Sequence, residues 1–496
     1  MQLPGTTDIL ARTALRSPHA PCLVDGGVSL SYAEMDARVE RTAAFLWHHG
    51  ARPGTRVAWL LQAGVQLVEV VHALVRLGAV SVPLSHRLTP PEVAFQTADC
   101  TVALVLAHES LAGSASLVTA PRLSIPLESG GKDPLTDHDL SPAPVHTGAA
   151  SDIHSILYTS GTTGRPKGAM LSHGNLLASA FASMQRLGHS PQDRWLLCMP
   201  QYHVGGLSIL LRAALGGTAV VVHAAFDPGR VLRALESERI TRLSLVATML
   251  ERVLQQSGDA DCPPHLQSLL LGGGPAPADL QERALRQRFP VLATYGLTET
   301  CSQATTVDPL RLTEQLGTAG PPLWFTDLRI VDEDGRPLAQ GEAGEILVRG
   351  PTVMQGYTGQ PEATAHALRD GWLHTGDIGL LDGDGNLRVL DRRADLIISG
   401  GENVYPAEVE SALRAFPAVA DAVVVARSDA RWGQVPVALV ALYAPLDEAT
   451  LKVFLEQRLA RFKLPQAIHA VPQVPRSAGG KLLRQAARAL VKELEP

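Results

Sequence analysis

The chain has 496 residues, too many for one hydrophobic core, because single cores stop growing near about 250–300 residues, so at least two domains are expected. Its 45% hydrophobic content indicates a globular protein, and a net charge of −6 with a pI near 6.3 offers no basic field for nucleic acid. Five scattered cysteines without a C-x-x-C pair fit a reducing cytoplasm, and neither a signal sequence nor an apolar run of about 18 residues indicates secretion or a membrane span.

The first part of the chain alternates predicted helices and strands. Residues 31–34 match a capping box, and the apolar spacing after them predicts a helix as far as Gly50. Further on we expect a strand at 56–62, a helix at 65–77, a strand at 79–83, a helix at 92–98 and a strand at 101–107. This rhythm indicates a parallel sheet with helices on both faces. Residues 110–150 are rich in Ser, Pro, Gly and Thr and are expected to be irregular.

Residues 158–168 have the composition of a phosphate-binding loop and follow a strand-like run at 153–157. Glycine lets the backbone approach an anion closely, while hydroxyl groups and a lysine supply donors and positive charge. Pro166 and Gly168 stand where a Walker A loop needs Gly and Ser or Thr, so this is a different kind of cradle. Taken alone, the segment could also be a surface loop. The candidate phosphate ligands are Thr159, Ser160, Gly161, Thr162, Thr163, Gly164 and Lys167.

The alternation then resumes and later changes character. We expect strands at 194–199, 218–223, 241–246, 267–271 and 291–294, and helices at 206–215, after 227, at 249–256 and at 279–288. Short strands at 327–331, 345–349 and 387–390 predict a β-rich subdomain, and an α+β segment follows from residue 397. The predicted fold is α/β: a large amino-terminal domain, residues 1–391, with two βαβ-type sheet lobes plus the β-rich subdomain, and a small α+β carboxy-terminal domain, residues 392–496.

Four further loops carry groups suited to nucleotide chemistry. Residues 295–300 offer an aromatic ring, hydroxyls and a carboxylate, and the glycine-rich loop 272–277 follows a strand, where ligands lie in open sheets. Asp377 stands in a short loop, and Lys481 lies in a glycine-containing loop before the last helix. Each alone could be a helix cap, a turn or a solvated side chain.

Together with residues 158–168, these loops resemble the signature motifs of the adenylate-forming superfamily, which comprises acyl- and aryl-CoA ligases, luciferases and peptide-synthetase adenylation domains. The resemblance implies an ATP-dependent ligase that makes an acyl-adenylate and pyrophosphate, and then a thioester and AMP. ATP, Mg²⁺ and coenzyme A would be its cofactor and co-substrates. A rotation of the mobile small domain would separate the two steps.

The resemblance also assigns roles to single residues. Tyr295 would pack on adenine, Thr298 would contact the phosphates, and Glu299 would hold the magnesium ion. Asp377 and Arg392 would grip the ribose, while Gly273 and Gly274 would belong to the nucleotide site. Lys481 would neutralise the carboxylate and the α-phosphate. The hinge would lie at Ala394, a departure from the Asp or Lys of many relatives.

The acid pocket is expected around residues 200–215. His203 stands where the superfamily places a gate between acid pocket and thiol tunnel. Arg212 interrupts an otherwise apolar predicted helix, and a buried charge is costly unless it is paired, so it needs an anion. That anion could be a substrate carboxylate or a structural acid. Ser208, Ser244, Thr248 and Gln303 are further candidates for the pocket.

Within the superfamily, residues 272–277, 298–303 and 390–410 most resemble the 2-succinylbenzoate–CoA ligases of menaquinone synthesis. That substrate has one carboxylate to activate and a second that Arg212 could recognise. Three alternatives stay open: a fatty- or aryl-acyl-CoA ligase, a stand-alone adenylation enzyme that loads a carrier protein, and an AMP-sensing binder. The expected partners are the small molecules 2-succinylbenzoate, ATP and CoA, with no nucleic acid and no membrane span, and a homo-oligomer is possible.

Overall fold

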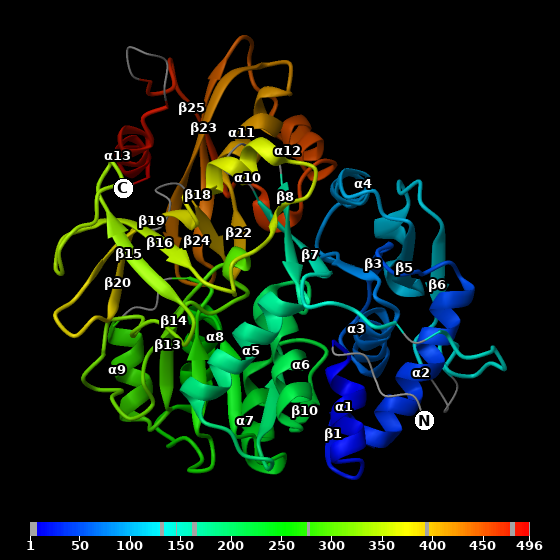
Figure 1. Cartoon of the computed structure of the whole chain (residues 1–496). Helices are drawn as coiled ribbons and strands as arrows, with labels where there is room; N and C mark the ends of the chain where they lie inside the picture. The colour runs from blue at the N-terminus through cyan, green and yellow to red at the C-terminus, as the bar shows by residue number, and fades with distance from the viewer. Residues whose placement is uncertain are drawn as a thin grey trace.

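The computed structural model describes residues 7–128, 133–144, 146–160, 166–274, 278–391, 396–476 and 482–495. Its large amino-terminal domain contains two sheet lobes and a β-rich subdomain, and a smaller carboxy-terminal domain lies across them at the top of Figure 1, coloured orange to red. The predicted fold class is therefore confirmed. Among the described residues, no helix combines the length and the apolar character needed to cross a bilayer.

The first lobe is built on a seven-stranded sheet with a parallel centre. Its order is β17 (Gly356–Tyr357), β8 (Pro166–Ser172), β7 (Ile153–Ser160), β4 (Val80–Pro83), β3 (Arg56–Leu60), β5 (Leu104–His108) and β6 (Arg122–Ile125). Strands β8 and β17 pair antiparallel at one edge. The helices of this part are α2 (Tyr32–His48), α3 (Val65–Leu77), α4 (Pro90–Asp99) and the 3-10 helix η1 (Glu109–Ala115).

The second lobe has an eight-stranded sheet. Its order is β14 (Thr305–Thr306), β13 (Val291–Tyr295), β12 (Ser268–Leu271), β11 (Arg242–Leu245), β9 (Arg194–Leu197), β10 (Ala219–Val222), β1 (Pro21–Asp25) and β2 (Val28–Ser31). Only the two edge strands are antiparallel to their neighbours. The associated helices are α1 (Ile9–Arg16), α5 (His173–Leu187), α6 (Val204–Gly216), α7 (Pro228–Ser237), α8 (Ala247–Ser257) and α9 (Ala278–Arg286).

A shared hydrophobic core joins the two lobes. Buried side chains of α2, α3, α5 and α6 pack with residues of both sheets, such as Trp59 of the first and Val220 of the second. On the other face of the second sheet, α7, α8 and α9 cover a separate core. The apolar run of α3 explains its central place, because every residue of the helix except Arg76 is buried.

The remaining sheets are smaller. The subdomain contains β15 (Asp327–Val331), β16 (Gly344–Arg349), β18 (Leu368–Arg369), β19 (Trp372–Leu381) and β20 (Leu387–Asp391), with α10 (Pro361–Ala367) beside it. The carboxy-terminal sheet contains β21 (Ile397–Ser399), β22 (Glu402–Val404), β23 (Val419–Asp429), β24 (Gly433–Leu442) and β25 (Ala467–Ala470). Its helices are α11 (Pro406–Arg414), α12 (Glu448–Glu456), η3 (Arg461–Lys463) and α13 (Arg484–Leu494).

Most predicted elements are confirmed within a few residues, including the capping box at Ser31 and Glu34 and the Asp227 cap with Pro228 at the helix start. The expectation of irregular structure at 110–150 is corrected, because β6 adds a parallel edge strand to β5 there. The strand lacks the apolar pattern that would predict it, because Arg122 and Ser124 are polar and exposed at the edge of the sheet. An edge strand needs no continuous apolar run.

Candidate active site

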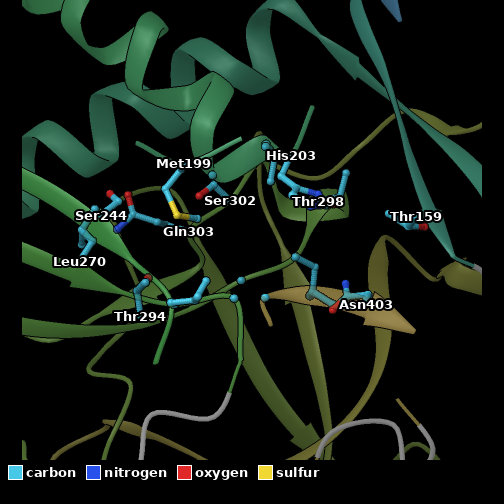
Figure 2. Close-up of a pocket in the computed structure, with 18 of the residues that line it drawn as sticks. Thr159, Met199, His203, Ser244, Leu270, Thr294, Thr298, Ser302, Gln303 and Asn403 are labelled. Atoms are coloured by element: carbon cyan, nitrogen blue, oxygen red, sulfur yellow. The ribbon is translucent and has the colours of Figure 1, made fainter. Parts of the chain in front are cut away.

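A cavity of about 170 Å³ lies at the carboxyl ends of β9, β11, β12 and β13, between the second lobe and the carboxy-terminal domain (Figure 2). In open α/β sheets this edge is where ligands bind. The large domain contributes residues from the ends of these strands, and the small domain closes the cavity with Leu396, Gly401, Asn403 and Tyr405. The cavity is therefore the candidate active site.

The loop after β13 turns sharply enough to bring four side chains to this cavity. A Cβ on Gly296 would lie 1.7 Å from the backbone oxygen of Ser302, so only glycine fits there. Cys301 and Ser302 have φ values of 54° and 92°, in the left-handed region that non-glycine residues rarely adopt. The turn places four side chains on the cavity wall: Thr298, Glu299, Ser302 and Gln303.

Two buried carboxylates on the cavity wall are each held by a tyrosine. The Tyr357 hydroxyl donates to Glu299 Oε1 at 2.8 Å, and the Tyr295 hydroxyl donates to Asp377 Oδ2 at 2.8 Å. Glu299 is 7% exposed and Asp377 is 2% exposed. The structure thus brings Tyr295 and Asp377, expected at the adenine and the ribose, into direct contact.

Glu299 suits a metal ion that arrives with a nucleotide. The described residues contain no group of three or more His, Cys, Asp or Glu side chains that could hold a metal ion by themselves. Magnesium does not require such a group, because it is usually bound by one or two carboxylates together with substrate phosphates and water. One oriented carboxylate at the cavity wall fits that mode of binding.

The base of the predicted phosphate loop lies beside these carboxylates. Strands β7 and β8 pair antiparallel with Thr159 opposite Lys167, and Thr159 lines the cavity. Lys167 Nζ lies 5.2 Å from the ring centroid of Tyr357, the residue that holds Glu299. The Ser160 side chain and the tip residues Gly161, Thr162, Thr163 and Gly164 lie outside the described part of the chain.

The glycines after β12 mark the border with the small domain. Gly273 lines the cavity with a φ of 74°, which favours glycine. Gly274 instead faces the small domain, since a Cβ there would lie 3.2 Å from Ile398 Cδ1.

Arg212 is a buried cation at the cavity without an acidic partner among the described residues. It is 3% exposed, and its Nη1 donates to Gln303 Oε1 at 2.8 Å and to Ser183 Oγ at 3.2 Å. The guanidinium carbon lies 4.7 Å from the ring centroid of Trp195, and Nε has no hydrogen-bond partner in the described structure. Burial lowers the pKa of Arg212 to about 9. Arg242, also 3% exposed, differs because it pairs with Asp193 at 3.2 Å.

The other candidate acid-pocket residues divide into two groups. Ser244 and Gln303 line the cavity (Figure 2), and Arg212 belongs to the same lining. The structure places Ser208 and Thr248 elsewhere. The Ser208 hydroxyl donates to the Gly205 carbonyl of its own helix at 3.1 Å, and a Cβ on Gly433 of the small domain would lie 3.1 Å from Thr248 Cγ2.

His203 stands between this cavity and a second hollow of about 80 Å³, and it lines both. Its Nε2 lies 2.9 Å from Glu402 Oε2 of the small domain. Glu402 Oε1 accepts hydrogen bonds from Arg87 Nη1 at 2.9 Å and from the Tyr202 hydroxyl at 3.1 Å. Burial alone would raise the pKa of the Glu402 carboxyl, but His203 and Arg87 outweigh burial and lower that pKa to about 2.

Three residues with predicted roles, Arg392, Ala394 and Lys481, lie outside the described residues. The segments that flank Lys481 belong to the small domain. Arg476 Nε donates to Asp421 Oδ2 at 2.7 Å, and Arg476 forms a β-bridge with Leu482.

No sequence motif predicts Ser183, Trp195 or Arg87 at this site. Ser183 lies on α5, and the signal for this helix is the apolar spacing of Leu176, Ala180 and Leu187. Trp195 lies in β9, whose apolar pattern predicts a strand but no contact with a buried cation. A single arginine after β4, such as Arg87, carries no local signal, because its partner Glu402 is 315 residues away.

Comparisons with known proteins give consistent results. Residues 10–358 match the family described as AMP-binding enzyme, and residues 408–481 match the AMP-binding enzyme C-terminal domain. The chain is 42% identical over 488 residues to a 2-succinylbenzoate–CoA ligase of Geobacillus kaustophilus, and the match covers 98% of each chain.

Solved structures of o-succinylbenzoate CoA synthetase from Bacillus subtilis are also similar. A double mutant bound with its product analogue OSB-NCoA has a TM-score of 0.92 at 38% identity and covers 97% of this chain and 98% of that one. The complex with the acyl-adenylate intermediate OSB-AMP, with the same identity and coverage, has a TM-score of 0.74. The complex with ATP and magnesium ion also has a TM-score of 0.74 at 38% identity, and the match covers 97% of this chain and 99% of that one.

Proposed function

Because the chain belongs to the AMP-binding enzyme family, we propose that it is an ATP-dependent acid–CoA ligase that acts on 2-succinylbenzoate in menaquinone synthesis. In the first step, a carboxylate oxygen of the acid attacks the α-phosphate of ATP, and pyrophosphate leaves with the electrons of the broken P–O bond. In the second step, the CoA sulfur attacks the acyl carbon, the thiol loses its proton, and AMP leaves.

The unpaired charge of Arg212 is the observation that supports this acid most strongly. The buried guanidinium contacts two neutral oxygen atoms and the Trp195 ring, and among the described residues no acidic group supplies the counter-charge that would offset its burial. A ring carboxylate of the substrate would supply that counter-charge, while Ser244, Ser302 and Gln303 offer polar contacts on the same wall. The second carboxylate of the substrate would then extend toward Thr298 and Glu299.

The proposed nucleotide site uses groups that the structure brings to one wall. Asp377, oriented by Tyr295, would accept hydrogen bonds from ribose hydroxyls, and Thr159 and Thr298 would donate to phosphate oxygens. Lys167 would contribute positive charge near the phosphates. Glu299 would hold magnesium, which supplies charge neutralisation at the phosphates when it is bound.

The orientation of the small domain suits the second step better than the first. Among the compared structures, the product-analogue complex matches this structure more closely than do the adenylate and ATP complexes at the same identity. In this orientation Glu402 holds His203 at the border of the two hollows, and the outer hollow would serve as the entrance for the thiol. We therefore assign His203 as the gate.

Several parts of the proposal rest on the family resemblance. Lys481 would act in the first step, Arg392 would complete the ribose grip, and the hinge would lie at Ala394, close to the proposed domain boundary between residues 391 and 392. A cytoplasmic location is consistent with five free, buried cysteines. A homo-oligomer stays a prediction.

The direct test incubates the purified protein with ATP, magnesium, CoA and a panel of acids, with pyrophosphate release and the thioester followed by assay and mass spectrometry. We expect the thioester of 2-succinylbenzoate and little product from fatty or simple aryl acids. A clear preference for a fatty acid would replace the proposed substrate. Transfer to a carrier protein but not to CoA, or binding of AMP without turnover, would replace the reaction.

A further inference from the structure

Lys463 of the small domain is buried between two carboxylates that belong to different domains. Its Nζ lies 2.6 Å from Glu92 Oε1 and 2.7 Å from Glu408 Oε1, and the residue is 4% exposed. Glu92 belongs to α4 of the large domain, whereas Glu408 belongs to α11 of the small domain, as Lys463 does in η3. One of the two ion pairs therefore crosses the domain interface.

Charged neighbours shift the pKa values of Lys463 and Glu408. Burial by itself lowers the pKa of the Lys463 ammonium, but Glu408 and Glu92 outweigh it, so the pKa is raised. Burial raises the pKa of the Glu408 carboxyl, and its Oε2 has no hydrogen-bond partner in the described structure. Because buried ions are costly without their partners, the contact is sensitive to the geometry of the interface.

Glu92 is held in place independently of the small domain. Its Oε2 accepts hydrogen bonds from the Thr89 backbone N–H at 2.7 Å and from the Thr89 hydroxyl at 2.8 Å, which forms the capping box of α4. Its other oxygen is the one that meets Lys463. Rotation of the small domain would carry Lys463 and Glu408 away together and leave Glu92 in place. Of the two ion pairs of Lys463, only the pair with Glu92 therefore depends on orientation, as do the contacts of Glu402 with Arg87 and His203.

Lys463 also lies at the proposed thiol entrance. Phe462 and Lys463 line the outer hollow together with His203 and Thr298. We propose that the Glu92–Lys463 ion pair is a positioning contact for thioester formation, which selectively stabilises the domain orientation seen here. This inference rests on the proposed two-step ligase and adds the residues that select its second state.

Glu92→Gln tests this role, because glutamine keeps the size and the capping oxygen but removes the charge opposite Lys463. We expect acid-dependent ATP–pyrophosphate exchange within about twofold of the wild type. Thioester formation from preformed acyl-adenylate is expected to slow about tenfold, the scale of one charge-assisted contact. Glu34→Gln is the matched control. Glu34 has the same capping role toward Ser31 in α2, and we expect both steps to be unchanged.

A second measurement reports orientation without turnover. Spin labels on Leu117→Cys in the large domain and Val453→Cys in the small domain use exposed positions, and the five native cysteines are buried. Pulsed electron paramagnetic resonance of the protein with a bound non-hydrolysable acyl-adenylate analogue and CoA is expected to show one dominant distance. Glu92→Gln should lower that population, while Glu34→Gln should not.

The proposal would be overturned if Glu92→Gln slowed both half-reactions equally. It would also be overturned if the variant formed thioester at the wild-type rate with an unchanged distance distribution. Failure of the proposed function would look different. The wild-type protein itself would then give no acid-dependent pyrophosphate exchange, whereas the label distances would still report whether Glu92 selects the orientation.

Discussion

Arg212 donates a hydrogen bond of 2.8 Å to Gln303 Oε1, a neutral oxygen that satisfies the donor without balancing its charge. If a substrate carboxylate provides that balance, Arg212→Met will raise the apparent KM for 2-succinylbenzoate about 10–100-fold, as expected for loss of a charge-assisted pair. The KM for ATP should stay unchanged. Steady-state kinetics with each substrate varied in turn checks this, and an unchanged acid KM would remove Arg212 from the pocket.

Arg242→Met provides the contrast, because Arg242 is equally buried but pairs with Asp193. Its loss leaves a buried carboxylate without its cation and should lower the free energy of unfolding by about 3–5 kcal/mol. Arg212→Met leaves no buried carboxylate without its cation, so it should lower the free energy of unfolding much less. Urea unfolding of both variants tests the difference, and equal losses would indicate that Arg212 has an acidic structural partner.

Gln303→Glu should supply Arg212 with an internal counter-charge. We expect a higher melting temperature, because the buried cation becomes paired, and at least tenfold weaker binding of the acid, because the new carboxylate occupies its place. Calorimetric titration with a non-hydrolysable acyl-adenylate analogue and thermal unfolding measure the two effects. Unchanged affinity would argue against carboxylate recognition at this position.

Tyr357→Phe should affect magnesium dependence. The Tyr357 hydroxyl holds Glu299 Oε1 at 2.8 Å, and partners that orient a metal ligand commonly contribute about 10-fold or more to metal affinity. We expect the half-saturating magnesium concentration for pyrophosphate exchange to rise by a similar factor, with the acid KM unchanged. A magnesium curve that superimposes on the wild type would show that Glu299 needs no such support.

Three buried histidines predict acid sensitivity of the large domain. Burial lowers the pKa of His72 and His173 to about 4, and the pKa of His154 falls well below its usual 6.5. The unfolded chain therefore binds more protons than the folded one below about pH 6.5. Stability should be highest above that pH and fall as the pH drops toward 4, by on the order of 1 kcal/mol per histidine at pH 5.5.

His154→Phe separates this cause from general acid effects. Neither ring nitrogen of His154 has a partner among the described residues, so a hydrophobic ring should be tolerated and should flatten the loss of stability between pH 7 and 5.5. Exposed His19→Gln serves as the control. Urea midpoints across that range measure the slope, and an unaltered slope in His154→Phe would exclude this histidine as a cause.

The sequence allowed the elements with strong periodic patterns to be predicted. The helix at Val65–Leu77 was located to the residue, because its apolar run ends at Gly78, which adopts a left-handed cap. Short strands are harder to predict when residues distant in the sequence determine their pairing. Strands β21 and β22 have only three residues each, and tertiary contacts decide their pairing.

In the candidate site too, residues in local motifs can be predicted from the sequence, whereas contacts between residues distant in the sequence cannot. Motifs of adjacent residues predict Glu299 and Asp377 as site residues, but not the tyrosine hydroxyls that contact them, because Tyr357 is 58 residues from Glu299 and Tyr295 is 82 residues from Asp377. Arg212 was found because a charge interrupts an apolar helix. Ser208 was included for its polarity, yet its hydroxyl is satisfied within its own helix.

We propose that Arg212, a buried cation without an acidic partner among the described residues, selects an acid with a second carboxylate before the ligase activates it. The most direct measurement compares kcat/KM for 2-succinylbenzoate and for 4-oxo-4-phenylbutanoate, which lacks the ring carboxylate, in the wild type and in Arg212→Met. We predict a preference of about 100-fold in the wild type, near the strength of one charged contact, that falls toward unity in the variant. Equal use of both acids by the wild type would show that Arg212 does not recognise a second carboxylate.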